Sequence, residues 1–252
     1  MQGKISVLVR YLVICFAVTW STLLIRAALI AEGIAQLNSP ATIPLAIGMA
    51  GPMIAALIVR PDVQSKAGLH HALIDGSRKS FGWMMLVTVA AVAAYTLAAQ
   101  GLTANFVPNM LPMVLISNVT EALFCEELGW RGVLQPELER RLPYLEATLV
   151  TGAIWAIWHL PLWLTPGTPQ AAIPFPYFLV TTIAFSFWLA GLRRRGGSIL
   201  WCAVLHAAIN SCIACLTIPF GSVTLMVGLI AVTALSLWMG LGNQANRASK
   251  TR

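Results

Sequence analysis

The sequence predicts an all-α fold, a polytopic membrane helix bundle of about eight transmembrane helices with both termini in the cytoplasm. Composition is the first reason. Of the 252 residues, 58% are hydrophobic and only 10% are charged, whereas soluble domains carry about 25% charged residues. The second reason is the length of the apolar runs, because a helix needs about 20 residues to cross the hydrocarbon core. The third is the placement of positive charge.

Seven apolar runs are continuous enough to predict transmembrane helices directly. They cover residues 12–31, 43–59, 81–99, 145–164, 175–192, 198–218 and 223–241. An eighth run, residues 111–133, is interrupted by Glu121, Glu126, Glu127 and Arg131. A hydropathy average undervalues such a segment, but we include it as the fourth helix because the loop charges require it.

Lysine and arginine residues alternate between the predicted loops, as the positive-inside rule demands. They lie before the first run and after the second, fourth, sixth and eighth: Lys4, Arg10, Arg60, Lys66, Arg78, Lys79, Arg140, Arg141, Arg193, Arg194, Arg195, Arg247, Lys250 and Arg252. The other loops carry none. Eight helices satisfy this alternation and seven would break it. The net charge of +7 is therefore explained by the placement of lysine and arginine in the cytoplasmic loops. Membrane lipids are expected as partners, and nucleic acid is not.

The whole chain, residues 1–252, is predicted to form a single integral membrane domain, since no long linker or soluble segment is left over. The first apolar run exceeds the 7 to 15 residues of a signal-peptide core. Removing it would also break the charge alternation, so we expect it to be retained. The cysteines lie in or beside apolar runs and are interpreted as buried hydrophobic residues: Cys15, Cys125, Cys202, Cys212 and Cys215.

Ionisable residues inside transmembrane segments are functional candidates, because burying each in lipid costs several kcal/mol. The candidate catalytic residues are Glu126, Glu127, Arg131, His159, His206 and Asn210. Glu126 and His159 lie equally far from the predicted hairpin turn at residues 142–143, so they can meet at one depth. His206 and Asn210 share one face of the seventh helix through their i, i+4 spacing. The sequence therefore predicts one polar layer formed by three helices.

Within the fourth helix, Glu127 and Arg131 also stand at i, i+4, the spacing at which opposite charges pair. Glu126 then points about 100° away and is the better candidate for a base. A buried carboxylate can take a proton from water, and histidine and asparagine can donate hydrogen bonds to an oxyanion. These parts are sufficient for peptide hydrolysis.

The same atoms admit a second use, as a metal site. Glu126, His159 and His206 could bind a divalent metal such as zinc and leave a fourth position for water. The HExxH pattern of soluble metalloproteases is absent. Spacing alone leaves both alternatives open, so no cofactor is assigned.

Three short motifs between residues 118 and 211 carry a family resemblance. They are EELGWR from Glu126 to Arg131, WAIWH from Trp155 to His159, and HAAIN from His206 to Asn210. In this order and helical context the chain resembles the CAAX prenyl protease 2 and bacteriocin-processing group of intramembrane peptidases, known as CPBP or Abi proteins. One departure is Trp155, where that family usually has phenylalanine.

The resemblance implies an intramembrane endopeptidase whose site opens toward the cytoplasm. It implies that Glu126 and His159 activate the water, and that His206 and Asn210 stabilise the oxyanion through hydrogen bonds. Family members are described both as metalloproteases and as metal-independent glutamate proteases. The resemblance therefore also leaves open whether a metal takes part in the reaction. The implied substrate is a membrane-associated peptide or protein, either prenylated near its carboxy terminus or a bacteriocin precursor. The short, alanine-rich chain predicts a bacterial plasma membrane.

Two other classes of function are compatible with buried polar residues in a helix bundle. One is a catalytically silent binding or immunity factor that uses the same fold. The other is a small transporter, because buried Glu and His side chains also relay protons. Transporters commonly contain inverted repeats, and none is visible in this sequence. The intact motifs favour the peptidase.

Overall fold

The computed structural model describes residues 6–34, 42–104, 106–165 and 167–248. In these residues the secondary structure is helical apart from one short ribbon, which confirms the all-α membrane bundle. Five helices among the described residues are long and apolar enough to cross a membrane: Val7–Ala31, Lys79–Ala98, Tyr144–Leu164, Phe175–Arg194 and Val223–Gly242. Ile199–Cys215 is a shorter apolar helix. The count of eight spans and the cytoplasmic termini stay predictions.

The chain divides into two units, each formed by two stretches of sequence. The first unit comprises Met1–Leu69 and Phe124–Ile183, and the second comprises His70–Leu123 and Ala184–Arg252. Each unit is therefore built from an early and a late part of the chain, so that residues far apart in sequence pack together within it.

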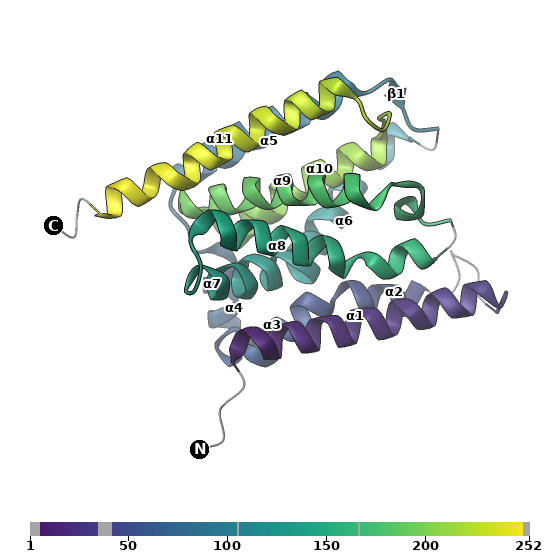
Figure 1. Ribbon diagram of the computed structural model, residues 1–252, viewed down its shortest axis with the longest axis horizontal. Coiled ribbons are helices and arrows are strands. Elements are labelled where there is room, and N and C mark those ends of the chain that lie inside the picture. The colour runs from purple at the N-terminus through teal and green to yellow at the C-terminus, as the bar shows by residue number, and fades with distance from the viewer. Residues whose placement is uncertain (1–5, 35–41, 105, 166, 249–252) are drawn as a thin grey trace, which may run out of the picture. The chain divides into compact units, whose positions relative to one another are not determined.

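The first unit begins with helix α1 (Val7–Ala31), which packs along α2 (Thr42–Met49) and α3 (Gly51–Val59) (Figure 1). The single helix expected over residues 43–59 is thus two helices. Pro52 lies in the first turn of α3, where its missing N–H and its ring are tolerated but the preceding helix is interrupted. Gly51 permits close approach to α1, because a Cβ there would lie 2.1 Å from Thr19 Oγ1.

After α3 come a 3₁₀ turn, η1 (Pro61–Gln64), and the short helix α4 (Lys66–Ile74). The later part of the unit contains α7 (Gln135–Glu139), α8 (Tyr144–Trp158), and two further 3₁₀ turns, η5 (Leu160–Leu164) and η6 (Pro169–Ala172). Helix α1 also packs against η5 and α8. These contacts place α1 beside the second sequence motif.

The charge-interrupted run is helical, as predicted, but it is not a regular α-helix. It is α-helical in α6 (Leu111–Thr120) and then π-helical in η3 (Glu121–Glu127) and η4 (Trp130–Leu134). A π turn is wider than an α turn and often occurs at functional sites. The 100° per residue assumed for Glu126 and Glu127 therefore does not hold in this segment.

The second unit contains α5 (Lys79–Ala98), a 3₁₀ turn η2 (Pro108–Met110), α6, α10 (Ile199–Cys215) and α11 (Val223–Ala248). Helix α11 runs along α5 (Figure 1), and α10 packs against both α5 and α6. Helix α9 (Phe175–Arg194) contributes residues to both units. Strands β1 (Gly101–Leu102) and β2 (Leu216–Thr217) pair antiparallel. Two residues are too few for an alternating pattern, so this ribbon was not predicted.

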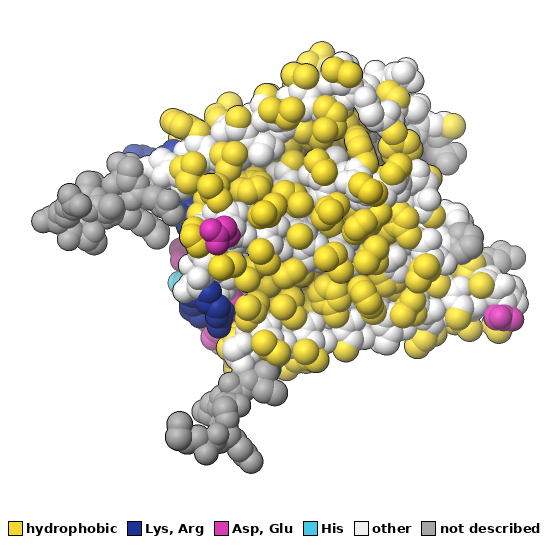
Figure 2. Space-filling view, viewed as in Figure 1, with side chains coloured by type: hydrophobic (Ala, Val, Ile, Leu, Met, Phe, Trp, Pro, Cys, Tyr) yellow, Lys and Arg dark blue, Asp and Glu magenta, His cyan; other side chains and the backbone are white. Residues whose placement is uncertain are grey.

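Large apolar side chains remain exposed along the long helices. Val13 on α1 is 62% exposed, Leu97 on α5 is 76% exposed, and Val223 on α11 is 75% exposed. Figure 2 shows hydrophobic side chains over most of the helical surface in view. Such a surface is unfavourable in water and suited to lipid, which agrees with the membrane assignment.

Candidate active site

Glu126 lies in η3 and is only 3% exposed. Two indole N–H groups donate to the same carboxylate oxygen, Oε2: that of Trp130 at 3.2 Å and that of Trp155 at 2.5 Å. Trp130 follows four residues later on the same helical segment, whereas Trp155 belongs to α8. A buried carboxylate requires such donors, because it has lost its hydrogen bonds to water.

The predicted pair of Glu127 and Arg131 is confirmed. Arg131 Nε lies 3.5 Å from Glu127 Oε2, and both side chains are completely buried. The Arg131 guanidinium carbon also lies 5.0 Å from the centroid of the Trp155 ring, within the range of a cation–π contact. Arg131 therefore contacts both the neighbouring carboxylate and the tryptophan that binds Glu126.

His159 ends α8 and is 8% exposed. Its Nδ1 lies 2.9 Å from the carbonyl oxygen of Trp155. Because a carbonyl only accepts, we assign the proton to Nδ1, which makes Nε2 the acceptor nitrogen of the neutral ring. The edges of Trp158 and Phe178 enclose the imidazole, with ring centroids 4.5 Å and 5.2 Å away. The hydrogen bond to the Trp155 carbonyl and these aromatic neighbours therefore restrict the orientation of His159.

Helix α1 contacts Trp158, the residue before His159, through two hydrogen bonds. The Trp158 Nε1 donates to Thr19 Oγ1 at 2.7 Å, and the Trp158 carbonyl accepts from Trp20 Nε1 at 3.2 Å. Trp158 also packs edge-on against Trp130, at a centroid distance of 5.5 Å, and Trp130 packs in turn against Tyr11. The two tryptophans next to the candidate residues are thereby held by a helix that carries no sequence motif.

In the second unit, His206 is buried on α10, with the Phe185 ring packed edge-on at 5.0 Å. Asn210 follows one turn later and is half-buried. Asn118 of α6 donates to Ser211 Oγ at 2.9 Å and so fixes α10 against α6. The i, i+4 arrangement of His206 and Asn210 is present. Their meeting with the residues of the first unit stays a prediction.

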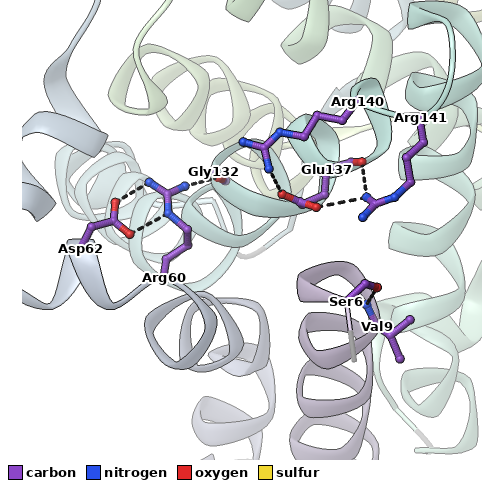
Figure 3. A network of polar contacts seen from close by, with 8 residues as sticks. All are labelled: Ser6, Val9, Arg60, Asp62, Gly132, Glu137, Arg140 and Arg141. Atoms are coloured by element: carbon purple, nitrogen blue, oxygen red, sulfur yellow. Dashed lines mark hydrogen bonds and ion pairs between the residues drawn. The ribbon is translucent and has the colours of Figure 1, made fainter. Parts of the chain in front are cut away.

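Near the end of the first motif, Arg60 connects the loop after α3 to η4 (Figure 3). Its Nη1 donates to the Gly132 carbonyl at 3.1 Å, and its Nε donates to Asp62 Oδ1 at 2.8 Å. The hydrogen bond from Arg60 lowers the pKa of the exposed Asp62 carboxyl, and the same bond raises the pKa of Arg60. The contact with Gly132 ties this loop to the residue after Arg131.

Glu137 of α7 accepts from both arginines that the sequence placed in the cytoplasmic turn (Figure 3). Arg140 Nη1 bonds Glu137 Oε1, and Arg141 Nη1 lies 3.1 Å from Glu137 Oε2. Glu137 is 8% exposed, whereas both arginines are exposed. This network closes the hairpin between the first two motifs and was not predicted.

Sequence reasoning missed Trp130 and the donor role of Trp155. Trp130 stands at i+4 from Glu126, and Trp155 stands at i−4 from His159. This spacing could have identified both as neighbours of the candidate residues. Glu121 is half-buried at the start of η3, and Arg26 is buried on α1 at 3% exposure.

The metal alternative rests on Glu126, His159 and His206. Within the part of the chain that the structure describes, no three His, Cys, Asp or Glu side chains lie close enough together to hold a metal ion. Sensitivity of the activity to a chelator would distinguish this alternative from a metal-free carboxylate.

Comparison with known proteins matches the motif-bearing part of the chain. A family model described as "Type II CAAX prenyl endopeptidase Rce1-like" matches residues 107–212, which include all three motifs. A "CAAX prenyl protease 2" of Methanococcus maripaludis is 34% identical over 58 residues, which is 23% of this chain and 19% of that protein. The chain thus spans about a fifth of that relative's length in the alignment. Both findings support the CPBP family of intramembrane peptidases that the three motifs indicated.

Proposed function

We propose that this protein is an intramembrane endopeptidase of the CAAX prenyl protease 2 type. It hydrolyses peptide bonds of membrane-associated substrates at a site open to the cytoplasm. The observation that carries the proposal is the buried Glu126 carboxylate, held by two indole donors, one of which is Trp155, the residue whose carbonyl orients His159. A carboxylate in such surroundings is suited to exchange a proton with a reacting water.

In the proposed reaction, Glu126 takes a proton from water while the oxygen attacks the carbonyl carbon of the scissile bond. The carbonyl electrons move to its oxygen, and His206 and Asn210 donate hydrogen bonds to that oxyanion. His159 accepts a hydrogen bond from the attacking water through Nε2 and so orients it. When the oxyanion collapses, the C–N bond breaks and the proton on Glu126 passes to the leaving amine. Glu126 returns to its charged form.

The substrate class follows from the membrane location and from what the relative's name says of that protein. We propose a peptide segment anchored at the cytoplasmic surface, with a prenylated carboxy-terminal motif and a bacteriocin precursor as the two chemical types to compare. The proposed location is a bacterial plasma membrane.

The test is peptide cleavage by the purified full chain in detergent, with prenylated and unprenylated peptide sets. Glu126→Gln keeps an oxygen that can accept the indole N–H bonds but removes the base, so cleavage should fall by at least about 100-fold. Glu121→Gln is the matched control, because it makes the same change five residues earlier on η3 and should retain cleavage.

A chelator added to the wild-type reaction separates the two chemistries. Loss of cleavage with chelator, restored by a divalent metal, would show metal-dependent hydrolysis, and unchanged cleavage would favour the carboxylate alone. If Glu126→Gln cleaves as fast as the wild type, the catalytic assignment is wrong. If the wild type cleaves no peptide in either set, the silent binding factor becomes the better account.

A further inference from the structure

Trp155 contacts three residues of the sequence motifs, each through a different part of its structure. Its indole N–H donates to Glu126 Oε2 at 2.5 Å. Its ring face lies under the Arg131 guanidinium, with 5.0 Å between the guanidinium carbon and the ring centroid. Its backbone carbonyl lies 2.9 Å from His159 Nδ1. Phenylalanine at this position would keep an aromatic face but would lack the N–H donor.

The two hydrogen bonds on Glu126 are unequal and converge on one oxygen. Trp155 reaches across from α8 and makes the shorter bond, whereas Trp130 donates at 3.2 Å from the same helical segment. Two fixed donors on Oε2 restrict rotation of the carboxylate and so determine where Oε1 points.

The cation over the Trp155 ring adds to this effect. A guanidinium held against an indole face draws electron density from the ring and makes its N–H a stronger donor. Arg131 is completely buried, so solvent does not screen this interaction. Arg131 and Glu126 are thereby linked through the Trp155 side chain.

We propose that Trp155 is a positioning residue for the reaction: its N–H, strengthened by Arg131, fixes Glu126 Oε2 and directs Oε1 toward the reacting water. This inference rests on the proposed peptidase function. A role in packing alone would make phenylalanine equivalent here. The N–H is what phenylalanine lacks, so Trp155→Phe separates the two roles while retaining an aromatic face for Arg131.

The kinetic test compares Trp155→Phe with the wild type in the peptide cleavage assay. Because the lost hydrogen bond is made to a charged group, kcat should fall roughly 10- to 100-fold, with KM within about twofold. Trp130→Phe removes the longer bond and should lower kcat less. Installing 3-benzothienylalanine at position 155 keeps the bicyclic shape without the N–H, and should reproduce the loss seen with Trp155→Phe.

Trp188→Phe is the matched control. Trp188 is completely buried and donates its indole N–H to Thr233 at 2.9 Å, so the change removes a comparable bond elsewhere. Its kcat should stay within about twofold of the wild type, because its N–H bonds Thr233 and not a residue of the three motifs. If Trp155→Phe or the benzothienyl variant retains the wild-type kcat, the positioning role is overturned. An equal loss of kcat in Trp188→Phe would overturn it as well.

A second measurement does not depend on activity. In a full chain labelled with ¹⁵N-tryptophan, the Trp155 indole resonance is identified by its absence in Trp155→Phe. A hydrogen bond to a carboxylate moves an indole proton downfield, so Glu126→Gln should move this resonance upfield, and Arg131→Met should move it in the same direction. If the chemical shift of the Trp155 indole proton is unchanged in Glu126→Gln, the inference is overturned, even if the wild type proves to cleave no peptide. Cleavage failure with the expected shifts would reject the peptidase function alone.

Discussion

Single buried hydroxyl and indole groups connect the elements of the first unit. Thr19 is completely buried on α1, where its Oγ1 accepts the indole N–H of Trp158 and donates to the Gly48 carbonyl, both at 2.7 Å. One side chain thereby ties α1 to α2 and to the residue before His159. In a membrane interior, where water is scarce, each of these groups would otherwise lack a partner.

Thr19→Val should lower the free energy of unfolding by about 1–2 kcal/mol, because it leaves the Trp158 N–H and the Gly48 carbonyl without this partner. Denaturant unfolding in detergent measures the change. Thr96→Val is the control, since Thr96 is exposed on α5 and its hydroxyl donates to the Val92 carbonyl of its own helix. It should change the free energy by less than about 0.5 kcal/mol. Equal effects of the two substitutions would contradict the bridging role of Thr19.

At the scale of elements, the first motif lies on π turns that approach other helices closely. Gly129 stands between η3 and η4, and a Cβ there would lie 2.5 Å from Tyr11 Oη and 2.7 Å from the Pro52 carbonyl oxygen. The glycine in EELGWR is therefore required by contact with α1 and α3. The same close approach brings Tyr11 against the ring of Trp130.

Gly129→Ala should destabilise the protein by about 1–3 kcal/mol, because the backbone of α3 cannot move away as a flexible side chain could. Gly82 lies on an exposed part of α5, where an added Cβ would have nothing within 4 Å apart from the adjoining backbone of its own helix. Gly82→Ala should therefore be neutral or stabilising by up to about 1 kcal/mol. Melting temperatures of the two variants in the same detergent provide the comparison. A Gly129→Ala protein as stable as Gly82→Ala would argue against the tight contact.

Most element boundaries were predictable because lipid imposes one length and one composition on each span. The run predicted over residues 81–99 is α5 at Lys79–Ala98, and the run over 175–192 is α9 at Phe175–Arg194. The break between α2 and α3 and the π turns of η3 and η4 were not predicted. Apolar residues continue through the break, and the average helical period is too coarse to reveal a single widened turn.

For the molecule as a whole, the exposed apolar faces indicate the solvent, and the alternation of positive charge indicates the orientation. The apolar faces of α1, α5 and α11 require a lipid environment. The charges predict which loops face the cytoplasm. Orientation in the membrane is therefore open to a direct test at the loops.

Cysteine labelling in intact cells should reveal this orientation, starting from a variant in which the native cysteines are replaced. Gln100→Cys and Phe220→Cys lie in exposed loops without positive charge, and should react with a membrane-impermeant maleimide. Asp75→Cys and Glu146→Cys are exposed beside the basic loops and should react only after the cells are opened. Labelling of Glu146→Cys in intact cells would contradict the eight-span arrangement.

The helical membrane class, the lipid environment and the residues of the three motifs were all predictable from the sequence alone. These follow from composition, from run length and from i, i+4 spacing, all of which are local properties of the chain. The folded structure was needed to show that two indole donors bind one oxygen of Glu126, that Arg131 lies over the Trp155 ring and that His159 Nδ1 faces the Trp155 carbonyl. The hydrogen bond from Trp155 to Glu126 joins residues 29 positions apart and depends on how α8 packs against a π-helical segment, which no local pattern encodes.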